Sequence, residues 1–295
     1  MSNRLESRRA AVLAFFVLIA IYILVAKVGQ LLVSRGVDVT VVWLPSGVAL
    51  AALFLFGFRL WPGILIGSFI VYSSGILGST SAATNPESLQ SQVLLSFTDT
   101  LEALLAAFLL RRLIGFRNPC NRPQDVFKFA VLAGGVSCAI GATASVVTLG
   151  LMGDIHNDMF GTNWLYQWLA HTIGILVMTP VIINWYAGRD MIWARRRALE
   201  SAIALGLLLL AGNCVFGGWL KSETSEIPLS CLAVLLLLWP ALRLSQRETS
   251  TAILLLAAIA IWGSTKGYGP FADEPGHESI LMLQGFVGLV AVSGL

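Results

Sequence analysis

The chain has 295 residues, of which 57% are hydrophobic and only 12% are charged, and its mean hydropathy is +0.80. Soluble domains carry about a quarter charged residues, so this composition excludes an ordinary water-soluble domain. The formal net charge of +3 is small, and its distribution fits membrane orientation better than a nucleic-acid partner. We therefore expect the lipid bilayer, and no nucleic acid, as the main partner of this chain.

Apolar runs long enough to cross a bilayer recur along the whole chain. A helix needs about 20 predominantly apolar residues to cross a hydrocarbon layer of about 30 Å. Ten runs approach or reach this length, and they lie at residues 9–32, 40–57, 60–78, 91–112, 126–150, 164–187, 199–219, 227–242, 249–265 and 279–295. The sequence predicts an all-α, polytopic transmembrane helical bundle of about ten spans, or eight if two short segments are not full spans. Residues 1–295 are expected to form one membrane domain, because the loops are too short to fold separately.

Basic residues predict the orientation of these spans. Residues 1–9 are basic and lead into the first run without a small-residue cleavage signal, so the first run is expected to be retained. Basic residues collect in loops on the cytoplasmic side of membrane proteins. With a cytoplasmic N-terminus, all but four of the 19 lysines and arginines fall on that side, and the exceptions are Lys27, Arg35, Lys221 and Lys266. The C-terminus is then cytoplasmic as well, and we expect a cytoplasmic output domain after residue 295.

Ionisable residues inside the runs are the first candidates for function. A charged side chain at the centre of a membrane helix costs about 2.5–3.5 kcal/mol on insertion scales, so each one needs a reason. Asp99 and Glu102 lie three residues apart and share a helix face, about 12–17 Å below the predicted outer end of their run. His171 lies at a comparable depth, about 10 Å into its run. These groups are placed to converge in one outward-facing polar pocket.

Three further residues extend this candidate pocket. Gln284 lies near the outer end of the last run, and Trp43 and Trp168 each precede a small-residue or polar segment that leaves the ring free to line a cavity. The candidate ligand-binding residues are Asp99, Glu102, His171, Trp43, Trp168 and Gln284. We expect the occupant of this pocket to be a small molecule or a proton. The proton is included because a histidine with a nearby carboxylate can titrate between pH 5 and 8. The alternative is that Asp99 and Glu102 bind nothing from solution and are hydrogen-bonded between helices or paired with Lys27.

No motif in the sequence predicts catalysis, a metal or a cofactor. The four cysteines, Cys120, Cys138, Cys214 and Cys231, form no CxxC pair and do not cluster with histidines, so neither a zinc site nor a disulfide framework is supported. The glycine-rich stretches follow no strand and match no phosphate-binding loop, and HExxH and GxSxG are absent. We expect no catalytic residues in this chain.

Five segments resemble the bacterial membrane-associated sensor family called MASE, first type. They are 43–49 (Trp-Leu-Pro-Ser-Gly-Val-Ala), 57–63 (Gly-Phe-Arg-Leu-Trp-Pro-Gly), 99–103 (Asp-Thr-Leu-Glu-Ala), 174–176 (Gly-Ile-Leu) and 267–271 (Gly-Tyr-Gly-Pro-Phe). They stand in the family's order, and the resemblance extends over nearly the whole chain. The family is generally described with about eight spans, and His171 stands where an acidic residue is expected.

The resemblance implies a sensor domain in the inner membrane of a bacterium. Such domains usually precede cytoplasmic histidine kinase or diguanylate cyclase domains, which implies two-component or cyclic-di-GMP signalling by an output domain in the same polypeptide. A homodimer is also compatible with this role. Two other classes remain open: a secondary transporter of a small solute, which also places carboxylates among its spans, and a scaffold that only anchors and dimerises its output domain.

Overall fold

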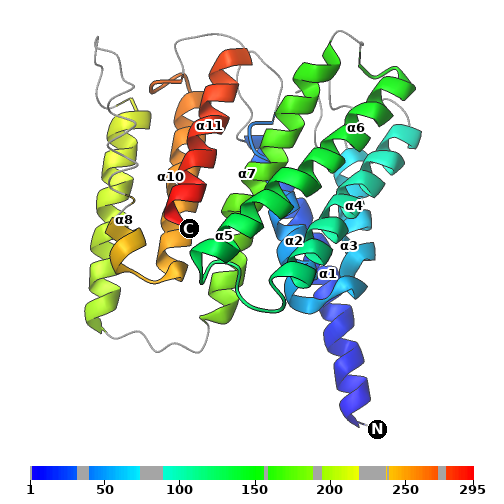
Figure 1. Cartoon of the computed structure of the whole chain (residues 1–295), viewed down its shortest axis with the longest axis horizontal. Helices are drawn as coiled ribbons and strands as arrows, with labels where there is room; N and C mark the ends of the chain where they lie inside the picture. The colour runs from blue at the N-terminus through cyan, green and yellow to red at the C-terminus, as the bar shows by residue number, and fades with distance from the viewer. Residues whose placement is uncertain are drawn as a thin grey trace.

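The chain folds as an all-α helical bundle. The structure is a computed structural model that describes residues 2–31, 40–73, 89–155, 159–188, 195–218, 237, 239–271 and 277–295. The helices of these residues, labelled as in Figure 1, are α1 (Ser2–Leu31), α2 (Leu44–Phe56), η1 (Phe58–Leu60), α3 (Trp61–Ser73), α4 (Leu89–Leu113), α5 (Pro123–Phe129), η2 (Ala130–Ser137), α6 (Cys138–Met152), α7 (Phe160–Ala187), α8 (Arg195–Phe216), α10 (Gln246–Thr265) and α11 (His277–Gly294). The predicted fold class is confirmed.

The described helices account for nine of the ten predicted spans. By length and composition, six of them can cross a membrane, and three shorter apolar helices cover Leu44–Phe56, Phe58–Ser73 and Glu278–Gly294. The tenth prediction, 227–242, lies outside the described residues except for 237 and 239–242. The predicted run 126–150 is one span built from α5, η2 and α6, with a π-helical stretch in its middle.

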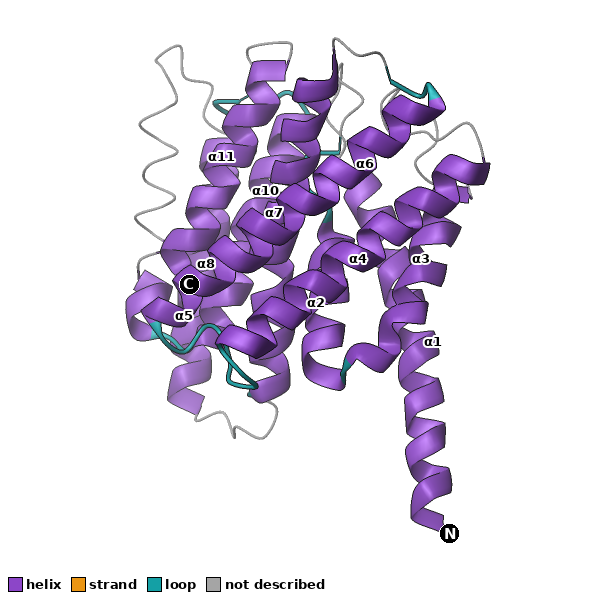
Figure 2. Ribbon diagram, turned by 45° about the vertical axis from the view of Figure 1, so that its right-hand side comes forward, coloured by secondary structure: helices purple, strands orange, loops and turns teal. Residues whose placement is uncertain are grey.

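Helix α7 lies at the centre of the bundle. It packs against α2, α6, α10 and α11, while α1 packs against α3 and α2, and α3 against α4. In Figures 1 and 2, α1, α2, α3, α4 and α6 lie on one side of α7 and α8, α10 and α11 on the other, and α1 extends past the bundle toward the N-terminus. A change in the position of α7 would therefore alter packing contacts in both halves of the bundle.

Small residues bring α2 and α7 into close contact. A Cβ atom added to Gly174 would collide with the carbonyl of Trp43, and one added to Gly47 would collide with the carbonyl of Gly174. Small residues at helix interfaces in membranes let two backbones approach in this way. Two hydroxyls reinforce the contact: Ser46 Oγ donates to the carbonyl of His171 at 3.1 Å, and Thr179 Oγ1 donates to that of Gly47 at 3.0 Å. The close packing fixes Trp43 against α7.

The predicted helical span over 40–57 is wrong at its start, because α2 begins only at Leu44. Residues 40–43 are not helical, yet Val41 is fully buried. The backbone N–H of Trp43 donates to the carbonyl of Ala170 at 3.0 Å, and Gln284 Nε2 donates to the carbonyl of Val41 at 2.9 Å. Non-helical backbone at membrane depth is tolerated only where protein buries it. We call residues 40–43 the buried entry segment.

The buried entry segment also explains how so short a helix completes a span. At about 1.5 Å per residue, the 13 residues of α2 cover about 20 Å, which is less than the hydrocarbon layer. The four non-helical residues 40–43 lengthen this span beyond the helix itself. Pro45 in the first turn of α2 marks the change because its missing N–H is not needed there.

The opposite end of α2 is held by Arg111 of α4. Its Nη2 donates to the carbonyls of Leu53 and Phe54 at 2.6 and 2.7 Å, which are among the last carbonyls of α2. Its guanidinium also lies 4.7 Å from the centre of the Phe58 ring and 5.0 Å from that of Phe116. A cation at a helix C-terminus satisfies free carbonyls and opposes the helix dipole.

A second group of polar contacts joins α7 to α10 at the same end. Asn184 near the end of α7 accepts from Asn118 Nδ2 at 2.7 Å and donates through its own Nδ2 to the carbonyl of Gln246 at 3.1 Å. Arg247 Nη1 donates to the carbonyl of Gly188 at 3.2 Å. These bonds tie the loop before α5, the end of α7 and the start of α10 together. The N-terminus lies at this end of the bundle (Figure 1).

Candidate functional site

Asp99 and Glu102 lie one turn apart on α4, and both carboxylates are buried inside the bundle, with 7% and 3% of each residue exposed. One oxygen of Asp99, Oδ2, accepts hydrogen bonds from three hydroxyls. Ser68 Oγ of α3 lies 2.6 Å away, and the phenol oxygens of Tyr22 (α1) and Tyr72 (α3) lie 3.2 Å away. Hydroxyl donors from two neighbouring helices therefore stabilise this carboxylate in place.

Glu102 contacts residues of α6 and α7. His171 Nδ1 lies 3.0 Å from both of its carboxylate oxygens, which gives an ion pair when the ring is protonated and a hydrogen bond when it is neutral. The thiol of Cys138 donates to Oε1 at 3.7 Å. On α6, a Cβ atom at Gly141 would collide with Oε2, so the glycine leaves the room that the carboxylate needs. The side chain of His171 keeps 12% of its surface exposed, at the edge of the cluster.

Trp43 joins these two carboxylate environments. Its ring lies nearly parallel to that of Tyr72, with centroids 6.3 Å apart, and nearly parallel to that of His171 on the other side, at 6.1 Å. Tyr72 contacts Asp99 and His171 contacts Glu102, so the indole lies between the partners of the two carboxylates. We call Tyr22, Trp43, Ser68, Tyr72, Asp99, Glu102, Cys138 and His171 the polar cluster.

Two buried atoms of the polar cluster have no hydrogen-bond partner among the described residues. They are Asp99 Oδ1, an acceptor, and Trp43 Nε1, a donor. The great majority of buried side-chain polar atoms in proteins have a partner, so each exception needs an explanation. The cluster is therefore incomplete at two atoms of opposite hydrogen-bonding character.

Four of the six candidate residues from the sequence come together in the polar cluster: Asp99, Glu102, His171 and Trp43. Gln284 lies outside it but contacts the carbonyl of Val41, two residues before Trp43. Trp168 lies outside as well. Lys27 is exposed, and no ion pair between it and Asp99 or Glu102 is present in the described part of the chain.

Trp168 is held away from the polar cluster by the π-helical stretch η2. Its Nε1 donates to the carbonyl of Gly135 at 3.1 Å, and its ring stacks on Trp164 with centroids 5.5 Å apart. Thr172 Oγ1 donates to the carbonyl of Gly134 at 2.7 Å. A π-helix shifts the backbone bonding by one residue relative to an α-helix, and such stretches are frequent at functional sites. Trp168 and Thr172, which lie before and after His171 on α7, thus both bind carbonyls of this stretch.

The sequence did not single out Tyr22, Ser68, Tyr72 or Cys138. Their hydroxyls and thiol are single polar atoms inside apolar runs, and such atoms usually bond to nearby carbonyls. One signal was available: Ser68 and Tyr72 are four residues apart, so they share a helix face, as Asp99 and Glu102 do. Among the described residues, no group of three or more His, Cys, Asp and Glu side chains is arranged to hold a metal ion.

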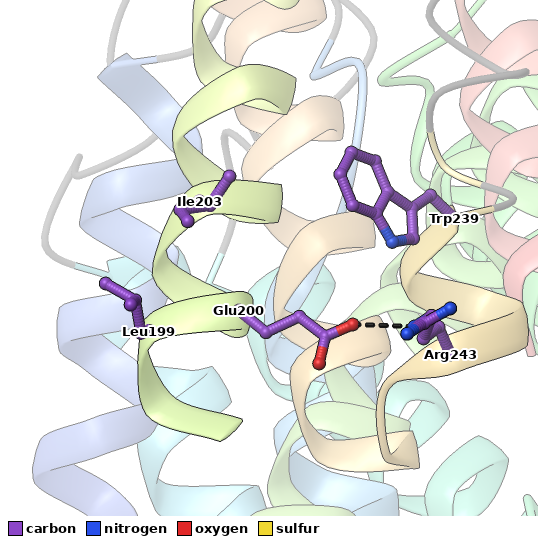
Figure 3. A pocket seen from close by; sticks show the side chains of 5 residues that line it. All are labelled: Leu199, Glu200, Ile203, Trp239 and Arg243. Atoms are coloured by element: carbon purple, nitrogen blue, oxygen red, sulfur yellow. Dashed lines mark hydrogen bonds and ion pairs between the residues drawn. The ribbon is translucent and has the colours of Figure 1, made fainter. Parts of the chain in front are cut away.

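A hollow of about 300 Å³ lies elsewhere, on the surface of α8. It is lined by Leu199, Glu200, Ile203, Trp239 and Arg243, and Figure 3 shows Arg243 directed at Glu200 across it. Arg243 Nε lies 2.7 Å from Glu200 Oε1, so the two charges satisfy each other. None of the candidate residues from the sequence lines this hollow.

The fold and the polar cluster define an integral-membrane helical domain that encloses acidic and aromatic side chains in its interior. The MASE1 family model matches residues 12–295, so the chain belongs to the MASE1 family of membrane sensor domains. The chain is also 26% identical over 216 residues to the probable diguanylate cyclase DgcE of Escherichia coli (strain K12). That alignment covers 72% of this chain but only 18% of the relative. No solved structure matches the chain.

Proposed function

We propose that this chain is the signal-input part of a bacterial signalling protein in the inner membrane. In this proposal the polar cluster receives an external or membrane-borne signal, and the helices carry it to a cytoplasmic kinase or cyclic-di-GMP output domain of the same polypeptide. The observation that carries the proposal is the incomplete polar cluster, which combines two buried carboxylates with an indole held on non-helical backbone. The name of the relative, a probable diguanylate cyclase, supports the cyclic-di-GMP output.

A signal acts by binding one arrangement of the helices better than another, since equal affinity for both shifts nothing. The polar cluster is suited to this because it draws side chains from α1, α3, α4, α6 and α7 and from the buried entry segment. An occupant that donates a hydrogen bond to Asp99 Oδ1, or that changes the bond between Glu102 and His171, alters the packing of Trp43. The buried entry segment then passes the change to Gln284 of α11.

The orientation with both termini in the cytoplasm is part of this proposal. Its support is the collection of basic residues at one end of the bundle, where Arg111 and Arg247 make the contacts described above. The N-terminus lies at the same end. With this orientation, α4 and α7 both enter the membrane from outside, and the polar cluster lies toward their outer halves.

The proposal is tested by fusing residues 1–295 to a diguanylate cyclase domain and measuring cyclic-di-GMP in cells over a range of growth media and external pH. We expect the output of the wild-type fusion to vary with condition. Glu102→Gln, which weakens the bond to His171, should give one constant output. The matched control is Glu278→Gln, because Glu278 is exposed at the start of α11.

The two rival classes give different results. If the purified domain takes up a labelled solute into liposomes, the chain is a transporter and the proposal is wrong. If a fusion carrying an unrelated membrane anchor responds to the same conditions as the wild-type fusion, the domain is only a scaffold. A wild-type response that Glu102→Gln leaves unchanged would refute the role of the polar cluster.

A further inference from the structure

A chain of contacts links the two residues that carry the unpartnered atoms of the polar cluster. Asp99 Oδ2 accepts from the phenol of Tyr72, and the ring of Tyr72 stacks on the indole of Trp43. The second oxygen of this carboxylate, Oδ1, and the indole Nε1 are both buried without partners in the described residues. The polar cluster therefore combines a free anionic acceptor on Asp99 with a free N–H donor on Trp43.

The charges around the cluster favour a positively charged occupant. Two carboxylates are buried there, and the only described basic group in contact with either is His171, which neutralises at most one of them. Lys27 is exposed, and Arg111 is bonded to the far end of α2. A buried negative charge without compensation is costly in a membrane protein.

The hydrogen-bonding pattern narrows the class of this occupant. All three hydroxyl donors go to Oδ2 of Asp99, which leaves Oδ1 for a donor that comes with the ligand. The indole N–H of Trp43 needs an acceptor, which a metal ion or a simple alkylammonium ion lacks. An anion would accept from the indole but would face two carboxylates. A molecule that carries both an ammonium group and a neutral oxygen satisfies both atoms.

We propose that the polar cluster binds a small ligand of the amino-alcohol type, whose protonated amine donates to Asp99 Oδ1 and whose oxygen accepts from Trp43 Nε1. This inference rests on the proposed function and names the chemistry of its signal. The ligand enters beside His171, the member of the Glu102 pair that keeps part of its surface exposed. Binding completes the cluster and holds the buried entry segment against α7.

Three matched probes test this ligand class on the wild-type domain in lipid nanodiscs, at neutral pH and constant ionic strength. Ethanolamine carries both groups, ethylamine only the ammonium, and ethanol only the oxygen. Since a ligand that binds only the folded state raises Tm, we expect saturating ethanolamine to raise it by about 2–4 °C. Ethylamine should raise it less, and ethanol should not raise it. Equal effects of all three probes on Tm would overturn the inference, because the site would then not distinguish the ammonium group from the oxygen. No effect of either amine would also overturn it, because water or a proton would then be the partner of the free atoms.

Two variants separate the roles of the two atoms. Asp99→Asn removes the charge and should abolish the effect of both amines. Trp43→Phe keeps an aromatic ring but removes the N–H, so it should remove the preference for ethanolamine over ethylamine while the response to ethylamine remains. Trp185→Phe is the control, because Trp185 lies at the other end of α7, where its Nε1 bonds to Thr251. A Trp43→Phe domain that still prefers ethanolamine contradicts the assignment of the oxygen.

The ligand-binding measurements and the cyclase fusion test the ligand class and the signalling role separately. Binding that follows the expected order, together with a fusion whose output never varies, would reject the signalling role but keep the ligand site. A responsive fusion whose domain ignores both amines would keep the signalling role and reject the ligand class.

Discussion

Gln284 of α11 donates through Nε2 to the carbonyl of Val41 at 2.9 Å, and it is fully buried. The bond joins the last helix to the buried entry segment that carries Trp43. The other amide atom of Gln284, Oε1, has no partner among the described residues. The side chain thus connects the polar cluster with the helix that is expected to lead toward the output domain.

Replacing this amide should uncouple the output from the polar cluster. Gln284→Leu has a similar volume but leaves the carbonyl of Val41 unpaired, which costs about 1–3 kcal/mol. We expect a Tm lowered by a few degrees in nanodiscs, a retained response to ethanolamine and a constant output of the cyclase fusion. Met282→Leu, at an exposed position of the same helix, should change none of the three. A Gln284→Leu fusion with wild-type regulation would exclude this route of coupling.

The Glu102–His171 pair should show strong energetic coupling. Removing one partner of a buried ion pair leaves the other unsatisfied and costs about 3–5 kcal/mol. We expect Glu102→Gln and His171→Gln each to lower the stability of the domain, and the double variant to lose much less than the two losses added. A double-mutant cycle on thermal unfolding measures this difference. Additive losses would mean that the two side chains do not depend on each other.

The close approach of α2 and α7 predicts opposite outcomes for two glycines of the same helix. Gly174→Ala places a methyl group against the carbonyl of Trp43, and overpacking of this kind costs about 1–3 kcal/mol. Gly161→Ala meets open space and should be neutral or slightly stabilising. The yield of monodisperse protein in detergent and the Tm compare the two. Equal tolerance of both alanines would disprove the close packing.

Cys120 should resist alkylation although it lies in the loop between α4 and α5. Burial raises the pKa of its thiol from 9.0 to about 12. The reactive thiolate at pH 8 is then about a thousandfold scarcer than in an exposed cysteine. Mass spectrometry after iodoacetamide treatment should find this position unmodified in the folded protein and modified after unfolding. Rapid labelling of the folded protein would show that the loop does not bury the thiol.

The raised pKa of Cys120 also predicts how the stability of the fold changes with pH. The folded state favours the neutral thiol, so the titration of Cys120 leaves the stability unchanged below about pH 9, where the thiol is neutral in both states. Between pH 9 and about pH 12 the unfolded chain ionises first, and the stability of the fold falls as the pH rises. Cys120→Ala should remove this part of the alkaline loss in an unfolding titration.

The spans and the central carboxylates were predictable because they depend on local properties of the sequence. Run length predicts helices, and a spacing of three residues places Asp99 and Glu102 on one face whatever surrounds them. The depth of each residue in its run placed His171 at the level of Asp99 and Glu102, but it did not determine which way the side chains face. These inferences needed no knowledge of which helices are neighbours.

What could not be predicted depends on contacts between distant segments. Residues 41–43 are apolar and were expected to be helical, but the backbone of 40–43 is not helical and bonds to Ala170 and Gln284, far away in the sequence. Trp168 is three residues from His171 and was expected beside it. The π-helical stretch supplies carbonyls that bind Trp168 instead, and no residue type in 130–137 marks that change of winding.

Helix α7 contains Pro180 between the polar cluster and the contacts of Asn184. Proline has no N–H to offer the preceding turn, and its ring pushes that turn aside, so a helix bends most easily at this point. We therefore expect the helix to act as two arms joined at Pro180, with His171 on one arm and Asn184 on the other. When the arm that carries His171 moves, the angle between the two arms changes, and Asn184 passes this change to the start of α10. An output domain attached to this membrane domain would then respond to a rotation of helices more than to a movement along the membrane normal.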